Sequence, residues 1–317
     1  MTPGRGRAPD AAHRGQVHRP PEPAVSFDHV NDAYRSPAAR DTVHEWCTAA
    51  LAGWGVAHES RTLEVPVHDT TVSTHVVAVG EGPPRLVWLP GTAMSTASSL
   101  DEIGALAEHG TVWALDLPGQ PGLSDPTRPR RDTTAWYSAW LEATLHAITL
   151  EWSSARELTL VGSGLGAAVC LSADSPVVTG RFLVGPGGLV PPRTSASQVR
   201  DRTRWSLRST PVTARAVLGH LVEPGGAIPD TLVEWLALVG RTCKTINHPR
   251  PLPQHYLDRI DGAPLTVVVG EDDTLVPPPA LSATVARRTS ATVVVVDGCG
   301  HLLPPERWEQ VLRVLPA

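Results

Sequence analysis

The sequence predicts an α/β fold in which helices cover both faces of a mostly parallel central sheet and a helical lid is inserted. Three observations carry this prediction. Short apolar runs alternate with helical segments over residues 85–184 and again over 265–314, which is typical of β–α–β crossovers. A glycine-rich turn follows one of these runs, at residues 162–166. Residues 186–262 interrupt the alternation, and a connection of that length needs structure of its own.

The composition is that of an ordinary globular protein, with 317 residues, 41% of them hydrophobic, and a formal net charge of −5. This mild negative charge gives no reason to expect nucleic acid or an anionic membrane as a partner. The four cysteines lie far apart and form no Cys-x-x-Cys pair, which argues against a zinc site and a disulfide framework. We therefore expect no metal and no organic cofactor.

No apolar run is long enough to span a bilayer, and no hydrophobic stretch follows the N-terminal arginines as a secretory signal would require. We expect a cytoplasmic protein without membrane insertion. Residues 1–25 are rich in Pro, Gly, Arg and His, so we expect a disordered tail there.

The first part of the α/β core is expected over residues 26–185. It opens with an amphipathic helix at 37–54. Two strands at 61–67 and 73–79 precede a short buried strand at 85–89, which predicts an antiparallel edge beside the central strands. The remaining elements of this part are helices at 98–109, 133–150 and 165–172 and strands at 111–115, 157–161 and 177–184.

The lid is expected over residues 186–262, with helices at 198–209, 212–221 and 230–243. The second part of the core, residues 263–317, resumes the alternation. Its expected order is a strand at 265–269, a helix at 280–288, a strand at 291–296 and a helix at 306–314.

The glycine-rich turn has the strand–turn–helix setting of a nucleophile elbow, Gly-x-Ser-x-Gly. Its flanking glycines are Gly162 and Gly166, so the central position is 164, which holds glycine. The nearby serine, Ser163, stands one place early. Shifting the frame onto it would put Val161 and Leu165 where the packing of strand on helix needs very small side chains. We therefore favour an ordinary backbone-capping role for Ser163 over that of a nucleophile.

Four motifs in order give the chain a resemblance to the α/β-hydrolase superfamily over residues 60–317. The first is Leu-Pro-Gly-Thr at 89–92, and the second is the turn that starts with Asp-Leu-Pro-Gly at 116–119. The elbow is the third. The fourth is a pair, Gly-Glu-Asp-Asp at 270–273 and Gly-Cys-Gly-His at 298–301. The resemblance implies that His301 is the catalytic base and Asp273 its acid, with Asp272 as a less favoured acid.

In such a site the carboxylate sets the tautomer of the imidazole and stabilises the imidazolium. The resemblance also implies an oxyanion hole made by the backbone N–H groups of Thr92 and Leu165. Glycine at 164 removes the strain of a positive-φ residue, on the order of 1–3 kcal/mol, and also removes the nucleophile. Covalent acyl-enzyme chemistry through residue 164 is therefore excluded for this sequence.

Three aromatic residues of the lid segment, Trp205, Trp235 and Tyr256, are expected to line an apolar substrate site, with a small core of the lid itself as the alternative. For Arg200, Arg202 and Arg204 we favour a solvated helix face over a clamp for a substrate carboxylate.

The resulting hypothesis is a hydrolase-like protein that acts on a small apolar ester or related carbonyl compound through an Asp–His general base and an oxyanion hole. Three alternatives stay open. The first is a catalytically silent pseudo-hydrolase that binds a small ligand or partner. The second is a serine esterase that uses Ser163. The third is a serine hydrolase in which position 164 has been altered.

Overall fold

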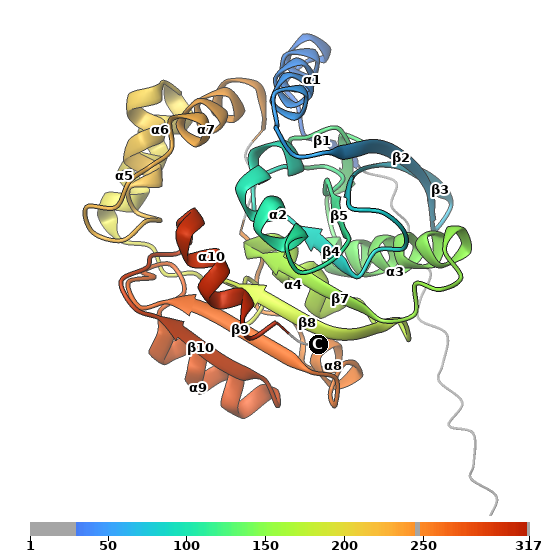
Figure 1. Ribbon diagram of the computed structural model, residues 1–317. Helices are drawn as coiled ribbons and strands as arrows, with labels where there is room; N and C mark the ends of the chain where they lie inside the picture. The colour runs from blue at the N-terminus through green and yellow to red at the C-terminus, as the bar shows by residue number, and fades with distance from the viewer. Residues whose placement is uncertain (1–29, 245–247, 316–317) are drawn as a thin grey trace, which may run out of the picture.

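The computed structural model describes residues 30–244 and 248–315 (Figure 1). The expected tail, residues 1–25, lies outside the described residues. The strands that build the main sheet are β2 (His58–Val67), β3 (Thr70–Val79), β4 (Leu86–Leu89), β5 (Val112–Leu115), β7 (Leu158–Ser163), β8 (Val178–Val184), β9 (Leu265–Gly270) and β10 (Thr292–Val296). They form one eight-stranded sheet in the order β10-β9-β8-β7-β4-β5-β3-β2.

The sheet is parallel from β10 through β5, and only β3 and β2 run antiparallel to their neighbours. The predicted mostly parallel sheet with an antiparallel edge is therefore confirmed. A second sheet pairs β1 (Val30–Asp32) with β6 (Thr127–Pro129). Neither strand was predicted, because three residues are too few for an alternating pattern to show.

Strand β4 illustrates why the central strands read as unbroken apolar runs. All four of its residues are buried. Leu86 and Trp88 belong to one apolar cluster, whereas Val87 and Leu89 belong to the other. Successive side chains of a strand point to opposite faces, so a strand covered by helices on both sides needs an apolar residue at every position.

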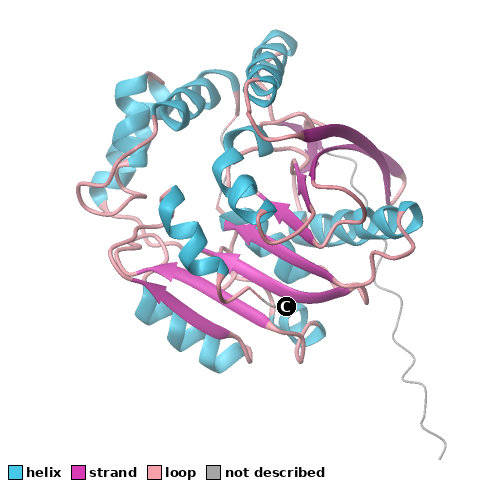
Figure 2. Cartoon of the chain, in the orientation of Figure 1, coloured by secondary structure: helices cyan, strands magenta, loops and turns pink. Residues whose placement is uncertain are grey.

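Different helices cover the two faces of the sheet (Figure 2). One apolar cluster takes its helical members from α3 (Thr133–Glu151), α4 (Gly164–Ser172), α8 (Gln254–Arg259) and α9 (Pro278–Arg288). The other includes α1 (Pro37–Ala52), α2 (Leu100–Ala107) and α10 (Pro305–Leu312), with the short helix η1 (Thr96–Ser98) beside them. Among the described residues, no helix has the length and apolar character needed to cross a membrane.

The lid consists of α5 (Ala196–Leu207), α6 (Pro211–Leu218) and α7 (Asp230–Thr242). These helices share a small apolar cluster of their own and lie beyond the carboxyl ends of the parallel strands (Figure 1). The segment after them returns to the core, since Leu252, Leu257 and Ile260 pack in the cluster beneath the sheet. The helical lid therefore spans residues 196–242, less than the 186–262 expected from the sequence.

Candidate active site

The turn between β7 and α4 has the geometry of an elbow centred on residue 164. Gly164 has a φ of 48°, in the left-handed region that glycine adopts without strain. A Cβ atom on Gly162 would lie 2.7 Å from the backbone nitrogen of Ala167, and one on Gly166 would overlap the carbonyl of Leu89. Strand and helix thus approach so closely that only glycine fits on either side of the turn.

Position 164 itself has room for a side chain. A Cβ atom built on Gly164 would lie 3.5 Å from Cα of Gly91 and 3.7 Å from the backbone nitrogen of Thr92, which are ordinary contacts. A side chain there would point toward the loop that follows β4. Because residue 164 is glycine, the space between the turn and this loop stays open.

Ser163 lies at the end of β7 with extended backbone angles. It is the N-cap residue of α4, but its hydroxyl makes no side-chain cap hydrogen bond, so the expected capping role is wrong. Ser163 lines the cavity of the site. Its Oγ lies near Gly91, since a Cβ atom built on that glycine would be 3.6 Å from this oxygen. Ser163 therefore stays a candidate group of the site.

The structure brings His301 and Asp273 into contact from two neighbouring loops, one after β10 and one after β9. Nδ1 of His301 lies 2.8 Å from Oδ2 of Asp273. The other carboxylate oxygen accepts hydrogen bonds from the backbone N–H groups of Leu275 at 2.9 Å and Val276 at 2.7 Å. With Asp273 ionised, the imidazole donates through Nδ1 and keeps Nε2 as an acceptor. Asp272 lies beside this pair, and the structure places Asp273 against the imidazole.

The buried carboxylate is thus held from both sides. The side chain of Asp273 has no exposed surface, and that of His301 is 11% exposed. A Cβ on Gly185 would come within 3.0 Å of Cε1 of His301, so the end of β8 confines the imidazole ring as well. This arrangement fixes the direction in which the ring can take up or release a proton.

The two expected oxyanion donors lie on either side of Gly164. Leu165 is in the first turn of α4, where backbone N–H groups have no acceptor within the helix and where the helix dipole favours negative charge. Thr92 lies on the loop after β4, and its backbone nitrogen faces the place of a residue-164 side chain. Both residues thus lie beside position 164, and Thr92 lines the same cavity as His301.

The loop that carries Thr92 is held in place by groups that the sequence analysis did not single out. Ala93 donates from its backbone N–H to Oε1 of Gln120 at 3.2 Å, and its carbonyl accepts from the indole N–H of Trp235 at 2.8 Å. Ala93 has a φ of 62°, which is uncommon for a residue with a side chain. Gln120 follows β5, the parallel neighbour of β4, and this position in the sequence could have indicated its contact with the loop after β4.

Asp116, at the start of the same turn as Gln120, is a second support of this loop. Its two carboxylate oxygens accept from the backbone N–H groups of Thr96 at 2.7 Å and Leu123 at 2.8 Å. Burial opposes the charge of Asp116, but hydrogen bonds from His75, Leu123 and Thr96 outweigh it and lower the pKa of Asp116. The turn that begins at Asp116, which resembles a motif of the α/β-hydrolases, thus stabilises the loop after β4 in this chain.

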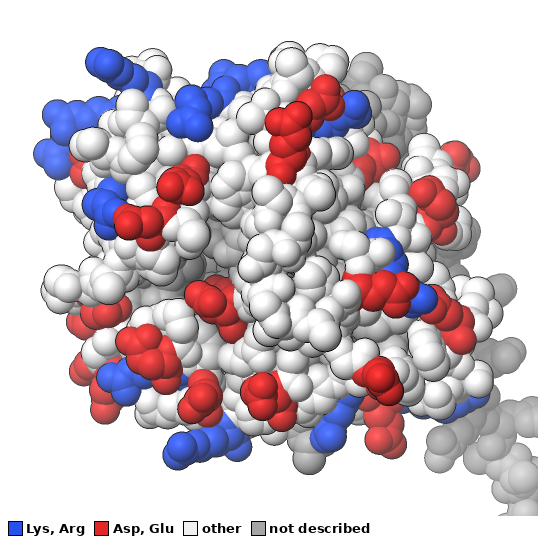
Figure 3. Space-filling model, turned by 45° about the horizontal axis from the view of Figure 1, so that its top comes forward, with Lys and Arg blue, Asp and Glu red and all other residues white. Residues whose placement is uncertain are grey.

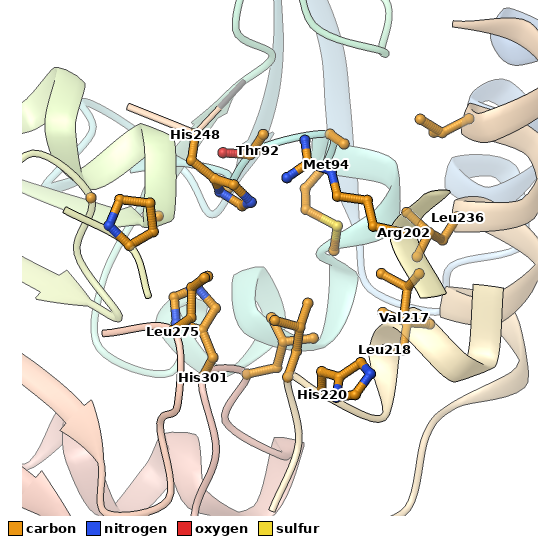
Figure 4. A pocket seen from close by; sticks show the side chains of 18 of the residues that line it. Thr92, Met94, Arg202, Val217, Leu218, His220, Leu236, His248, Leu275 and His301 are labelled. Carbon is orange, nitrogen blue, oxygen red and sulfur yellow. The ribbon is translucent and has the colours of Figure 1, made fainter. Parts of the chain in front are cut away.

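A cavity of about 630 Å³ joins these parts. Figure 4 shows Thr92 and Met94 on one side of it, His301 and Leu275 on another, and lid residues on a third. Apolar side chains of the lid face it, among them those of Val217, Leu218 and Leu236. Its size and lining suit a small organic molecule with a few polar groups.

Of the three lid-segment aromatics expected in the lining, only Trp205 lines the cavity. Trp235 is fully buried and packs against Trp46, with ring centroids 4.7 Å apart and ring planes at 41°, so a ligand cannot reach it. Tyr256 lies on α8, which packs on α4, with the Arg259 guanidinium 4.9 Å from its ring centroid. The expectation for Trp235 and Tyr256 is therefore wrong, because Trp235 packs between the lid and the core and Tyr256 belongs to the core.

The lid is bonded directly to the loops of the His–Asp pair. The backbone N–H of Leu302 donates to the carbonyl of Leu221 at 2.8 Å, and the Gln198 side-chain amide donates to Oγ1 of Thr274 at 3.1 Å. Both bonds join residues adjacent to His301 or Asp273 to the lid. The lid thus rests on the two loops that carry His301 and Asp273 and covers part of the cavity.

Glu102 lines the cavity from α2, and burial raises its pKa from 4.5 to about 7. A carboxyl whose pKa is raised in the folded state lowers the free energy of unfolding as the pH rises above 4.5. The whole of this loss is present above about pH 7. We therefore expect Glu102→Gln to unfold at a higher temperature than the parent at pH 8 but at the same temperature at pH 4. Thermal unfolding followed by circular dichroism measures this difference. Glu108→Gln, an exposed control just after the same helix, should show no such dependence, and an equal gain at both pH values would contradict the prediction.

Comparison with known proteins agrees with this architecture. The model of the alpha/beta hydrolase family matches residues 82–314. Among solved structures, carboxylesterase CesB (YbfK) from Bacillus subtilis is similar with a TM-score of 0.65 and 17% identity, covering 88% of this chain and 97% of that one. Naproxen esterase (carboxylesterase NP) from Bacillus subtilis is similar with a TM-score of 0.66 and 17% identity, covering 86% and 96%. No curated protein sequence matches the chain. At these identities the structural likeness concerns the fold.

Proposed function

This chain belongs to the alpha/beta hydrolase family, and we propose that it acts on a small apolar ester or related carbonyl compound by general-base catalysis without a covalent serine intermediate. The observation that carries the proposal is the 2.8 Å contact between His301 and Asp273 in the same cavity as the glycine elbow. This contact gives His301 an orienting carboxylate, and Thr92 and Gly164 line the same cavity as His301, which supports a base that acts beside an oxyanion hole without a side-chain nucleophile.

Hydrolysis then needs water as the attacking group. Nε2 of His301 takes a proton from a water molecule while the water oxygen bonds to the carbonyl carbon. The resulting oxyanion accepts hydrogen bonds from the N–H groups of Thr92 and Leu165. When the tetrahedral intermediate collapses, the bond to the alkoxide breaks and the alkoxide takes the proton back from His301. Asp273 stabilises the imidazolium between these two steps.

The open space at Gly164 supports water as the nucleophile. A serine side chain at this position would point at Thr92 and occupy the place from which a nucleophile attacks. Without it the vacated volume is on the order of that of one water molecule. A water there would lie between the imidazole and the carbonyl carbon of a bound ester.

Ser163 is the second candidate nucleophile, because it lines the cavity. The test is hydrolysis of p-nitrophenyl acetate and butyrate by the parent and by Ser163→Ala, with intact-protein mass spectrometry after mixing. We expect the parent to hydrolyse the esters above the buffer rate, Ser163→Ala to keep that activity, and neither protein to carry an acyl adduct. Loss of activity in Ser163→Ala would make the protein a serine esterase with a displaced nucleophile. A parent no faster than buffer would leave a ligand-binding role.

A further inference from the structure

We propose that the cavity is built for a ligand with a carboxylate group, and that Arg202 of the lid binds this carboxylate. The inference deepens the proposed function, on which it rests for the position of the reacting carbonyl near Thr92. The substrate class then becomes esters that carry a free carboxylate some distance from the carbonyl carbon.

The three arginines of α5 face in two different directions. Arg200 and Arg204 are one turn apart on the same side of the helix, and both are exposed beside Asp201, at 3.1 and 3.6 Å. Figure 3 shows basic side chains gathered over this part of the lid. Arg202, between them in sequence, must project from another side of the helix. A solvated face therefore describes Arg200 and Arg204 but not Arg202.

Arg202 lines the cavity and is half-buried. Figure 4 shows its side chain extending from the lid into the cavity, between His248 and Met94. A guanidinium has five N–H donors in a planar fork, so Arg202 can bind a carboxylate and keep another interaction within the chain. In the same view it lies across the cavity from His301, so a ligand that spans the cavity would contact both groups.

The charges around the cavity favour an anion. Three cationic side chains line it, those of Arg35, Arg202 and Lys244, and Glu102 is the single carboxylate in its lining among the described residues. The raised pKa of Glu102 leaves that carboxyl partly protonated near neutral pH. The lining thus carries more cationic than anionic side chains, in a chain whose net charge is −5. Arg35 and Lys244 are exposed, whereas Arg202 is half-buried, and a cleft lined by one sign of charge raises the local concentration of the opposite ion.

His248 adds a neutral hydrogen-bonding group next to Arg202. Burial, with the nearby charges of Arg202 and His301, lowers the pKa of His248 to about 4. At neutral pH its imidazole is therefore uncharged and offers one N–H donor. A carboxylate between Arg202 and His248 would accept from both, and charge-assisted bonds of this kind are stronger than neutral ones.

The test compares two probes that differ in one charge, monomethyl adipate and dimethyl adipate, by isothermal titration calorimetry at pH 7.5. Chromatography of the probes after each titration establishes that the esters are intact. We expect the parent to bind the monoester about tenfold or more tightly than the diester, as the strength of hydrogen bonds to charged groups implies. Arg202→Gln should remove this preference, Arg202→Lys should keep part of it, and the exposed control Arg204→Gln should keep all of it.

Equal affinity of the parent for the two probes would overturn the proposal, as would no binding of either probe or equal loss of the preference in Arg202→Gln and Arg204→Gln. The measurement needs no turnover. If the parent hydrolyses no ester but prefers the anionic probe, the general-base proposal fails and the anion site stands. If turnover is present and the preference is absent, the anion site alone fails.

Discussion

Gly164→Ser is expected to hydrolyse p-nitrophenyl butyrate faster than the parent by about two to four orders of magnitude and to form an acyl-enzyme. The serine Oγ would project toward the backbone nitrogen of Thr92, where there is space for it, and the proposed base, His301, already has Asp273 as its partner. Removing the serine from another hydrolase, subtilisin, costs on the order of 10⁶ in kcat. An introduced serine without further adjustment should recover only part of such a factor.

The same variant should be less stable than the parent. A residue with a Cβ at a φ of 48° costs on the order of 1–3 kcal/mol relative to glycine. Gly164→Ala is the matched control, because it carries the same backbone strain and no hydroxyl. It should share the lowered unfolding temperature and show no gain in hydrolysis. Equal hydrolysis rates for the two variants, without an acyl adduct on Gly164→Ser by mass spectrometry, would contradict the assignment of residue 164 as the elbow centre.

His301→Ala is expected to lower kcat/KM of the parent for p-nitrophenyl esters by about 10²–10⁴, the range for loss of a general base. Asp273→Asn should lower it comparably, because an amide in place of the carboxylate favours the wrong imidazole tautomer. In the Gly164→Ser background, His301→Ala should remove the gained activity. Steady-state kinetics on each variant, with circular dichroism to verify folding, makes the measurement.

His220→Ala is the control for these substitutions. His220 faces the same cavity from the lid, but its Nε2 lies 3.0 Å from Asp201 and it has no bond to Asp273. Its removal should leave most of the turnover in place. A loss as large as that of His301→Ala, or unchanged turnover in His301→Ala, would show that the His301–Asp273 pair is not the base of this reaction.

The site could be predicted from the sequence where its parts are local. The elbow glycines follow a buried strand and open a helix, and both the packing role of Gly166 and the turn conformation of Gly164 are consequences of that local order. His301 and Asp273 were predicted through a family resemblance. Their contact at 2.8 Å depends on the parallel pairing of β9 with β10, which places the two loops side by side.

The parts that could not be predicted depend on which side of an element faces the core. Trp205 and Trp235 are both lid tryptophans, yet only Trp205 lines the cavity. Trp235 is buried between α7 and the loop after β4, where its indole N–H donates to the carbonyl of Ala93. Arg202 differs from Arg200 and Arg204 in the side of α5 from which its side chain projects. Gln120 is a polar residue in a turn, and its contact with Ala93 joins segments far apart in the chain.

By itself the sequence determined the α/β class, the order of the strands in the main sheet along the chain, the parallel sheet with its antiparallel edge, and the glycine at the elbow, because alternation and turn residues act over a few positions. Tertiary structure decided the extent of the lid, the support of the Thr92 loop and the place of Arg202 in the lining of the cavity. These features come from contacts between residues distant in the chain, where burial and hydrogen-bond satisfaction select one packing among the many that the same local patterns allow.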